Sequence, residues 1–187
     1  MSVGSRISPK SKTPFAAFGG EKHLRSAWRT EKRYANGTTT MIQLPPDFRD
    51  LLQEFDAEGV RYLLVGGYAV MFHGYPRATK DIDLWIESST ANIQATKHAL
   101  ATFGAPVALL RTVSFLDPNE IFYLGVEPLR IDLFTAIPGV DFATCYPQRL
   151  TTSIQGVQVT IIDLDSLKRN KQASARPRDL DDLLHLP

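Results

Sequence analysis

Two aspartates separated by one residue, Asp81 and Asp83, follow a glycine pair, Gly66-Gly67, after a spacer of thirteen residues. Because side chains alternate along a strand, both aspartates are expected to point to one face of it. Carboxylates so close repel each other unless a cation lies between them. Mg²⁺ typically binds one or two carboxylates together with substrate phosphates. The pattern therefore predicts a metal and phosphate site.

The glycine pair follows an apolar run over 61–65 and precedes a helix expected over 68–73. Glycine lets a phosphate approach the backbone closely, and the free amides at a helix start bind phosphate oxygens. Taken alone, Gly66-Gly67 is typical of a tight turn, and Asp-x-Asp is typical of a solvated strand end. Their combination on consecutive elements favours the phosphate and metal interpretation.

A third carboxylate, Asp132, falls in the middle of an apolar strand expected over 129–134. Arg130 and Asp132 should face one way and Ile131 and Leu133 the other. An unpaired carboxylate in such a strand is costly to bury. Two interpretations stay open: a salt-bridged structural acid, or a third ligand beside Asp81 and Asp83 for a two-metal centre.

Several basic residues could contact phosphates, namely Arg77, Lys80, Lys171, Arg176 and Arg178. The alternative for the last three is a solvated helix end, where Lys and Arg are common. Asp179 and Asp182 are expected to be capping or surface charges. His73 is expected to be a packed or surface residue, Trp85 to pack in the core, and Cys145 to be a buried or loop thiol without a role.

The pattern of apolar residues predicts an α/β or α+β domain, with a small mixed β-sheet flanked by helices. Strands are expected over 61–65, 80–87, 107–115, 121–124, 129–134 and 157–162. A first helix is expected after Pro45-Pro46, with Asp47 as a possible cap and Gly59 at its end. Further helices are expected over 68–73, 90–103, 141–145, 166–173 and 177–184. Ser89 is the expected N-cap of the helix over 90–103.

Composition excludes several classes of protein. The 187 residues, 43% hydrophobic and 22% charged, are enough for one domain with a core. No apolar run approaches the roughly 18 residues of a membrane span. The single cysteine excludes an internal disulfide and a cysteine-based zinc site. We therefore expect a cytoplasmic protein that does not act at a membrane.

The charge is unevenly distributed. Residues 1–40 carry a net charge of +6 and the remainder −5. The first segment is rich in Ser, Thr and Gly and lacks an apolar period, so we expect it to be a disordered basic extension. It is either an arm that touches nucleic acid or a passive extension upstream of a natural start at Met41. The folded domain is expected over residues 41–187.

The motif resembles the signature of the DNA polymerase β-like nucleotidyltransferase superfamily: a hydrophobic residue, Gly-Gly or Gly-Ser, a spacer, Asp-x-Asp or Asp-x-Glu, and a later third acid. The stretch YLLVGGYAVMFHGYPRATKDIDLWIE is similar to small bacterial toxin-like members, including the abortive-infection type. The later stretch LKRNKQASARPRDLDDLLHL resembles their C-terminal helices. The resemblance spans about residues 41–187.

This resemblance implies a nucleotidyltransferase-like core and an enzyme that moves a nucleoside monophosphate from an NTP, such as ATP, to an acceptor hydroxyl. Asp81 and Asp83 would hold two Mg²⁺ ions, or Mn²⁺. Asp132 would bind the metal that activates the hydroxyl and serve as its base. Gly66 and Gly67 would cradle the triphosphate. The acceptor would be RNA, such as tRNA, or a protein.

The resemblance also implies a role in a toxin–antitoxin pair, with an antitoxin or a second copy as partner. The sequence departs from the antitoxin-like relatives, which usually have Gly-Ser and a Ser before the first Asp, where this chain has Lys80. Two other functions stay open: an inactive nucleotide- or partner-binding module, and a nucleotidyltransferase for an antibiotic-like small molecule.

Overall fold

The computed structural model describes residues 42–115, 117–118 and 120–187. The basic extension expected over residues 1–40 lies outside the described residues. The helices are α1 (Pro46–Ala57), α2 (Gly66–Phe72), α3 (Thr90–Phe103), α4 (Val107–Thr112), α5 (Phe142–Cys145), α6 (Leu164–Ser174) and α7 (Pro177–His185), with a 3₁₀ turn η1 (Tyr146–Gln148). The strands are β1 (Tyr62–Val65), β2 (Asp81–Ile86), β3 (Phe122–Leu124), β4 (Arg130–Phe134), β5 (Leu150–Ile154) and β6 (Val157–Ile161).

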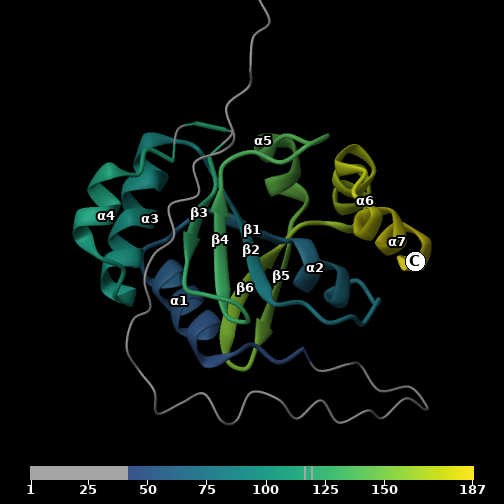
Figure 1. Ribbon diagram of the computed structural model, residues 1–187, viewed down its shortest axis with the longest axis horizontal. Helices are drawn as coiled ribbons and strands as arrows, with labels where there is room; N and C mark the ends of the chain where they lie inside the picture. The colour runs from purple at the N-terminus through teal and green to yellow at the C-terminus, as the bar shows by residue number, and fades with distance from the viewer. Residues whose placement is uncertain (1–41, 116, 119) are drawn as a thin grey trace, which may run out of the picture.

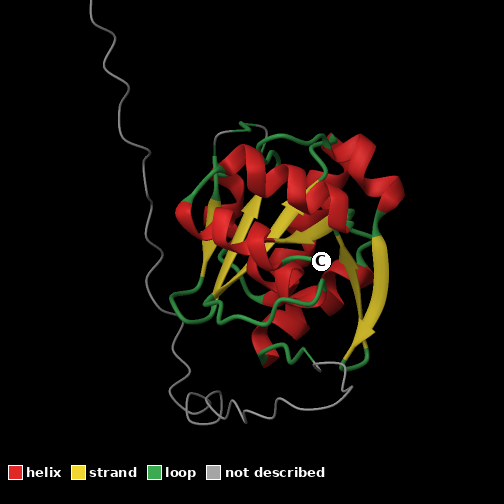
Figure 2. Ribbon diagram, turned by 90° about the vertical axis from the view of Figure 1, so that its right-hand side faces the viewer, coloured by secondary structure: helices red, strands yellow, loops and turns green. Residues whose placement is uncertain are grey.

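The strands in the described part of the chain form one six-stranded sheet in the order β3-β4-β2-β1-β6-β5. The pairs β2–β4 and β1–β6 are parallel, and the remaining neighbours are antiparallel. Helices α1, α3 and α4 lie on one side of this sheet and α2, α6 and α7 on the other (Figure 1). The view turned by 90° shows the strands between the helices (Figure 2). The mixed sheet flanked by helices that the sequence predicts is confirmed.

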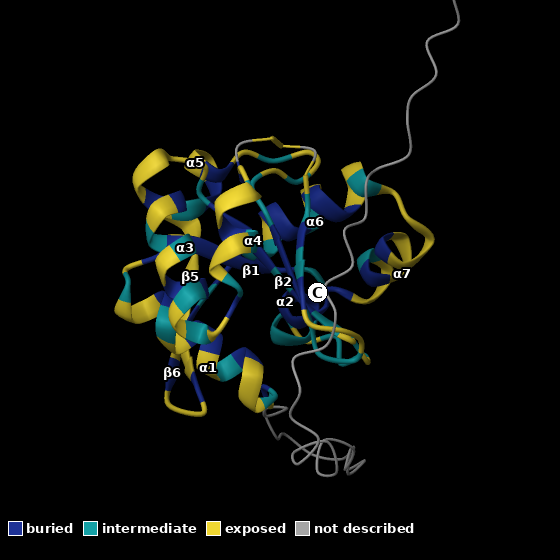
Figure 3. Cartoon of the chain, turned by 60° about the vertical axis from the view of Figure 1, so that its left-hand side comes forward, coloured by how far each residue is buried: buried dark blue, intermediate teal, exposed yellow. Residues whose placement is uncertain are grey.

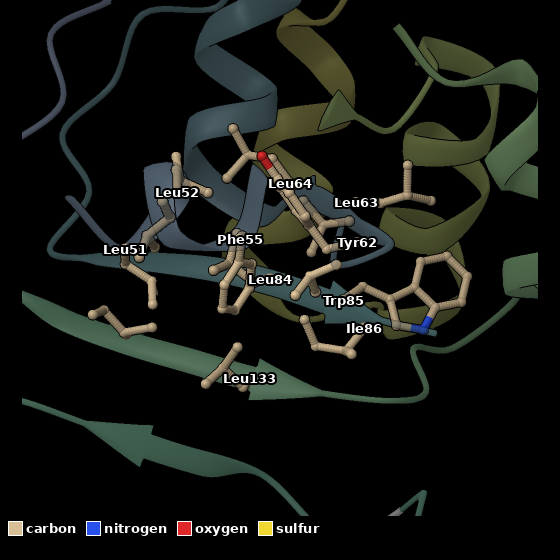
Figure 4. Packing of buried hydrophobic residues seen from close by; sticks show 14 of the residues in the cluster. Leu51, Leu52, Phe55, Tyr62, Leu63, Leu64, Leu84, Trp85, Ile86 and Leu133 are labelled. Carbon is tan, nitrogen blue, oxygen red and sulfur yellow. The ribbon is translucent and has the colours of Figure 1, made fainter. Parts of the chain in front are cut away.

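The main core lies between α1 and the centre of the sheet. Leu51, Leu52 and Phe55 of α1 are fully buried, and they pack toward Leu84 and Leu133 (Figure 4). β1 and β2 run through the buried centre, while α3 and α4 present exposed outer faces (Figure 3). Burial on both faces explains the nearly continuous apolar run of β1. Strands β1 and β2 are therefore held in place by packing on both faces of the sheet.

The expected strand over 107–115 is wrong, because Val107–Thr112 forms helix α4. A short apolar run does not distinguish a strand from a helix by periodicity. Pro106 is the N-cap residue of this helix, where its missing amide costs no intrahelical hydrogen bond. Only Leu110 of this helix is buried, and Val107 is exposed, which is the one-sided burial of a short surface helix.

Strand β5 has no counterpart among the strands expected from the sequence. Its residues are mostly polar and exposed, since it forms one edge of the sheet. A two-residue turn at Gln155-Gly156, both with positive φ, joins β5 to β6 in an antiparallel hairpin. The expected cap of α3 is confirmed, because the Ser89 side chain accepts a hydrogen bond from the Asn92 amide. Among the described helices, none combines the length and apolar character of a bilayer crossing.

Candidate active site

The register of two parallel strands brings the three aspartates together. In the β2–β4 pairing, Asp83 lies opposite Asp132, and Asp81 lies opposite Arg130. The Asp81 side chain is partly exposed (29%), whereas Asp132 is mostly buried (9%). The Asp83 side chain lies against Gly66 and is partly exposed. The structure thus places the third acid on the strand beside Asp81 and Asp83.

The glycine pair closes directly over these acids. Gly66 has φ +61°, and a Cβ built on it would lie 1.9 Å from Oδ2 of Asp83. A Cβ on Gly67 would lie 2.5 Å from Oγ1 of Thr79. The Gly67 amide donates a hydrogen bond to the Asp83 carboxylate. Both glycines are therefore required by the packing of the site itself.

Burial and like charges set the electrostatics of the acids. Burial, followed by the charges of Asp81 and Asp132, raises the pKa of Asp83 from its usual 3.8 to about 7, although Lys171 and the Gly67 amide oppose the shift. Burial also raises the pKa of Asp132, and hydrogen bonds from Arg130 counteract it. Asp83 therefore lacks full compensation for its charge.

Arg130 also belongs to the site, although the sequence motifs do not predict a role for it. Its Nε lies 2.6 Å from Oδ1 of Asp132, and its Nη2 lies 2.8 Å from Oδ2 of Asp132 and 3.0 Å from Oδ2 of Asp81. The hydrogen bond to Asp132, more than the neighbouring charges, raises the pKa of Arg130. The available signal is its position two residues before Asp132, which puts both side chains on one face.

A buried network of ion pairs holds α6 and α7 beside the site. Lys171 Nζ lies 2.6 Å from Oδ1 of Asp179 and 2.8 Å from Oδ2 of Asp182. Asp182 also pairs with Arg77, whose Nε lies 2.7 Å from Oδ1. Burial would raise the pKa of Asp179, but hydrogen bonds from Lys171 and Ser174 lower it. The network joins the spacer to both C-terminal helices.

This network corrects two expectations. Asp182 is not a surface or capping charge, because it is 0% exposed and is enclosed by Lys171 and Arg77. Lys171 is not at a solvated helix end, because it is 4% exposed. Asp179 is buried as well. The buried cations need these acids as partners, and a sequence pattern alone does not show such enclosure.

The other basic residues expected to contact phosphates lie around the edge of the acid group formed by Asp81, Asp83 and Asp132. Lys80 is exposed and pairs with Glu127 at 3.3 Å. Arg176 is 74% exposed, with its nearest carboxylate on Asp179 at 3.9 Å. Arg178 donates a hydrogen bond to the Ala78 carbonyl, which ties α7 to the spacer. Arg77 reaches inward instead, since its Nη1 is 3.2 Å from the position of a Cβ on Gly67.

Three further residues have structural surroundings. His73 Nε2 lies 2.8 Å from the Ile162 carbonyl oxygen. Trp85 is 1% exposed and donates from Nε1 to the Thr135 carbonyl. Cys145 is buried and unpaired with another cysteine. Trp85 therefore packs in the core as expected, Cys145 is a buried thiol, and His73 is half-buried.

The donor set suits a hard divalent cation, because Asp81, Asp83 and Asp132 offer only carboxylate oxygens. The pKa of Asp83 is raised by burial and by the charges of Asp81 and Asp132, and an added cation would favour its ionised form. The described residues, however, contain no group of three or more His, Cys, Asp or Glu side chains that could hold a metal ion in their present arrangement. The guanidinium of Arg130 bridges Asp81 and Asp132 instead.

Comparison with solved structures identifies the fold. The chain is similar to a candidate nucleotidyltransferase from Thermotoga maritima, with a TM-score of 0.50 and 14% identity over 74% of this chain and 87% of that one. An antigenic nucleotidyltransferase-like protein from Paracoccidioides brasiliensis matches with a TM-score of 0.44 and 20% identity, covering 73% of this chain and 72% of that one. No family model and no curated protein matches the sequence. The chain therefore has a nucleotidyltransferase-like α/β fold.

Proposed function

We propose that the protein is a metal-dependent nucleotidyltransferase that moves a nucleoside monophosphate from an NTP to an acceptor hydroxyl. The observation that carries the proposal is the β2–β4 register, which sets Asp83 opposite Asp132 under the glycine pair. The nucleotidyltransferase-like fold supports it.

In the proposed reaction, the acceptor oxygen forms a bond to the α-phosphorus, and the bond to the bridging oxygen breaks. Pyrophosphate leaves, and Asp132 accepts the proton of the acceptor hydroxyl. Asp81, Asp83 and Asp132 would hold two divalent cations, which supply charge stabilisation at the attacking and leaving oxygens when bound. Asp83 is suited to this task because its charge is incompletely compensated.

The basic residues differ in how readily they could meet the triphosphate. Arg77 commits Nε and Nη2 to Asp182, and its Nη1, which lies beside Gly67, donates to the Ala78 carbonyl at 3.4 Å. Lys80 and Arg176 are exposed at the rim and could turn toward a phosphate. Lys171 is already shared by two carboxylates, so we give it a supporting role instead of a direct phosphate contact.

The acceptor is proposed to be RNA, such as tRNA, or a protein, as in the toxin-like proteins that the sequence resembles. The test is transfer of label from each α-³²P NTP to total bacterial RNA and protein with Mg²⁺. The double variant Asp81→Asn, Asp83→Asn is the control. Label that disappears in the variant supports the proposal and identifies the nucleotide and the acceptor class. Equal labelling by both proteins would contradict it.

A second candidate is an inactive nucleotide- or partner-binding module, which the salt bridges from Arg130 to Asp81 and Asp132 favour. This candidate predicts NTP binding without label transfer to any acceptor. Expression in bacteria adds a test of the proposed toxin role. The wild type should arrest growth and the double variant should not, whereas an inactive module should leave growth unchanged.

A further inference from the structure

Arg130 forms a bridge between the two strands that carry the acids. Its guanidinium makes three contacts of 2.6–3.0 Å, two to Asp132 and one to Asp81. The two contacts to Asp132 involve both carboxylate oxygens, which is the bidentate geometry that the planar guanidinium favours. The side chain is 28% exposed, so it lies at the open side of the acid group. Arg130 therefore already supplies a positive charge to Asp81 and Asp132.

The same oxygen atoms would be needed by a divalent cation. A cation on Asp132 and Asp81 has to share lone pairs with Arg130 or replace it, and two positive groups at one carboxylate pair repel each other. Asp83 is influenced by a different cation, since the charge of Lys171 favours its ionised form. Loading of the site thus depends on whether Arg130 releases Asp81 and Asp132.

The structure offers Arg130 other contacts on the outer side. Nη1 lies 3.5 Å from Oε1 of Glu127, and the guanidinium carbon lies 5.1 Å from the centroid of the Tyr123 ring. Glu127 is about half exposed and also pairs with Lys80. A guanidinium that leaves the acids could remain near these groups, and the negative charge of a triphosphate bound at the site would attract it.

From these contacts we propose that Arg130 couples metal binding to triphosphate binding: it holds Asp81 and Asp132 until a triphosphate arrives, and then moves from the acids to the phosphate oxygens. Arg130 is a positioning residue in this role, and the inference rests on the proposed function. Without triphosphate, the wild type binds a divalent cation weakly because Arg130 competes for the acids. With triphosphate, Arg130 binds the phosphate oxygens instead of the acids, and the cation binds more tightly.

The experiment measures Mn²⁺ affinity by electron paramagnetic resonance, with and without inorganic triphosphate, which makes the result independent of the base. The variants are Arg130→Gln and Arg130→Lys. Arg149→Gln is the matched control, because it removes the same charge from an exposed arginine that contacts the Tyr146 ring instead of the acids. Thermal unfolding shows that each variant is folded, and Arg130→Lys keeps the test decisive if Arg130→Gln does not fold.

We expect Arg130→Gln to bind Mn²⁺ alone at least tenfold more tightly than the wild type, and triphosphate to increase its affinity much less. Arg130→Lys should fall between them, because lysine keeps the charge but not the bidentate geometry. Arg149→Gln should match the wild type. Equal Mn²⁺ affinities of the wild type and both Arg130 variants without triphosphate, with binding seen when it is added, would overturn this inference alone. Absence of Mn²⁺ binding in every protein, even with triphosphate, would overturn the proposed function as well.

Discussion

Gly66 and Asp83 are packed so closely that a Cβ on Gly66 would lie 1.9 Å from Oδ2 of Asp83, a separation that real atoms do not tolerate. Gly66 also has φ +61°, which residues with a side chain rarely adopt. The glycine of the motif and its second aspartate are thus one structural unit, although sixteen residues separate them. This contact explains why the two parts of the motif depend on each other.

Substitution of Gly66 by alanine should destabilise the fold more than substitution of Gly59. Gly59 has φ +64° with nothing within 4 Å of an added Cβ, so Gly59→Ala reports the backbone cost alone, about 1 kcal/mol. Gly66→Ala adds the clash with Asp83, at about 1–3 kcal/mol. Urea unfolding of both variants measures the difference. Equal losses of stability would show that Asp83 moves aside freely.

The stability of the metal-free protein should fall as the pH rises through the window set by Asp83. The folded chain holds the Asp83 proton up to about pH 7, whereas the unfolded chain releases it near pH 3.8. The folded state therefore carries more bound protons between these values, and each pKa unit corresponds to about 1.4 kcal/mol of lost stability. Asp132 acts in the same direction, and Asp179, whose pKa is lowered, acts in the opposite one.

The Asp83→Asn variant isolates this contribution. Unfolding by urea in EDTA at pH 5 and pH 8 should show a smaller decrease for the variant than for the wild type. Mg²⁺ added together with inorganic triphosphate should restore stability to the wild type at pH 8, because a cation favours the charged form of the acids. An unchanged pH dependence in Asp83→Asn would contradict the raised pKa of this group.

Removal of the Asp182 carboxylate should be strongly destabilising, because Lys171 and Arg77 would remain buried without it. Breaking a buried ion pair at one partner costs about 3–5 kcal/mol. The matched control is Glu127→Gln, which breaks the exposed pair with Lys80 and should cost less than about 1 kcal/mol. Chemical denaturation measures both. A loss for Asp182→Asn no larger than that of the control would mean that the network does not hold α7 in place.

Thr79 should affect catalysis more than stability. Its Oγ1 donates to Oδ1 of Asp81 at 2.9 Å and lies against Gly67, so it orients one of the acids. Thr79→Val should lower kcat/KM for nucleotide transfer about tenfold, which equals about 1.4 kcal/mol and one hydrogen bond to a charged group. Thr102→Val, on the exposed side of α3, is the control and should leave kcat/KM unchanged. Equal values for the two variants would remove Thr79 from the site.

The local features of this protein follow from short-range patterns in its residues. The residue patterns of 80–87 and 129–134 predicted two strands with the acids on one face, and the structure has strands at 81–86 and 130–134. The Ser89 cap and the two C-terminal helices also followed from short-range patterns. Short-range signals were insufficient for α4, whose apolar run suits a helix or a strand, and for the polar edge strand β5. Neither segment buries enough residues to show a clear periodic pattern of apolar side chains.

The pairing of the charges, in contrast, depends on how the helices and strands pack. Asp182 and Lys171 look like surface residues in the sequence, yet helix packing encloses them together with Arg77. Arg130 becomes the partner of Asp81 only because β2 and β4 are adjacent and parallel in one register. Residue spacing fixes which face of a strand a side chain occupies. The partner on that face depends on which strands and helices pack together, and that is a property of the whole fold.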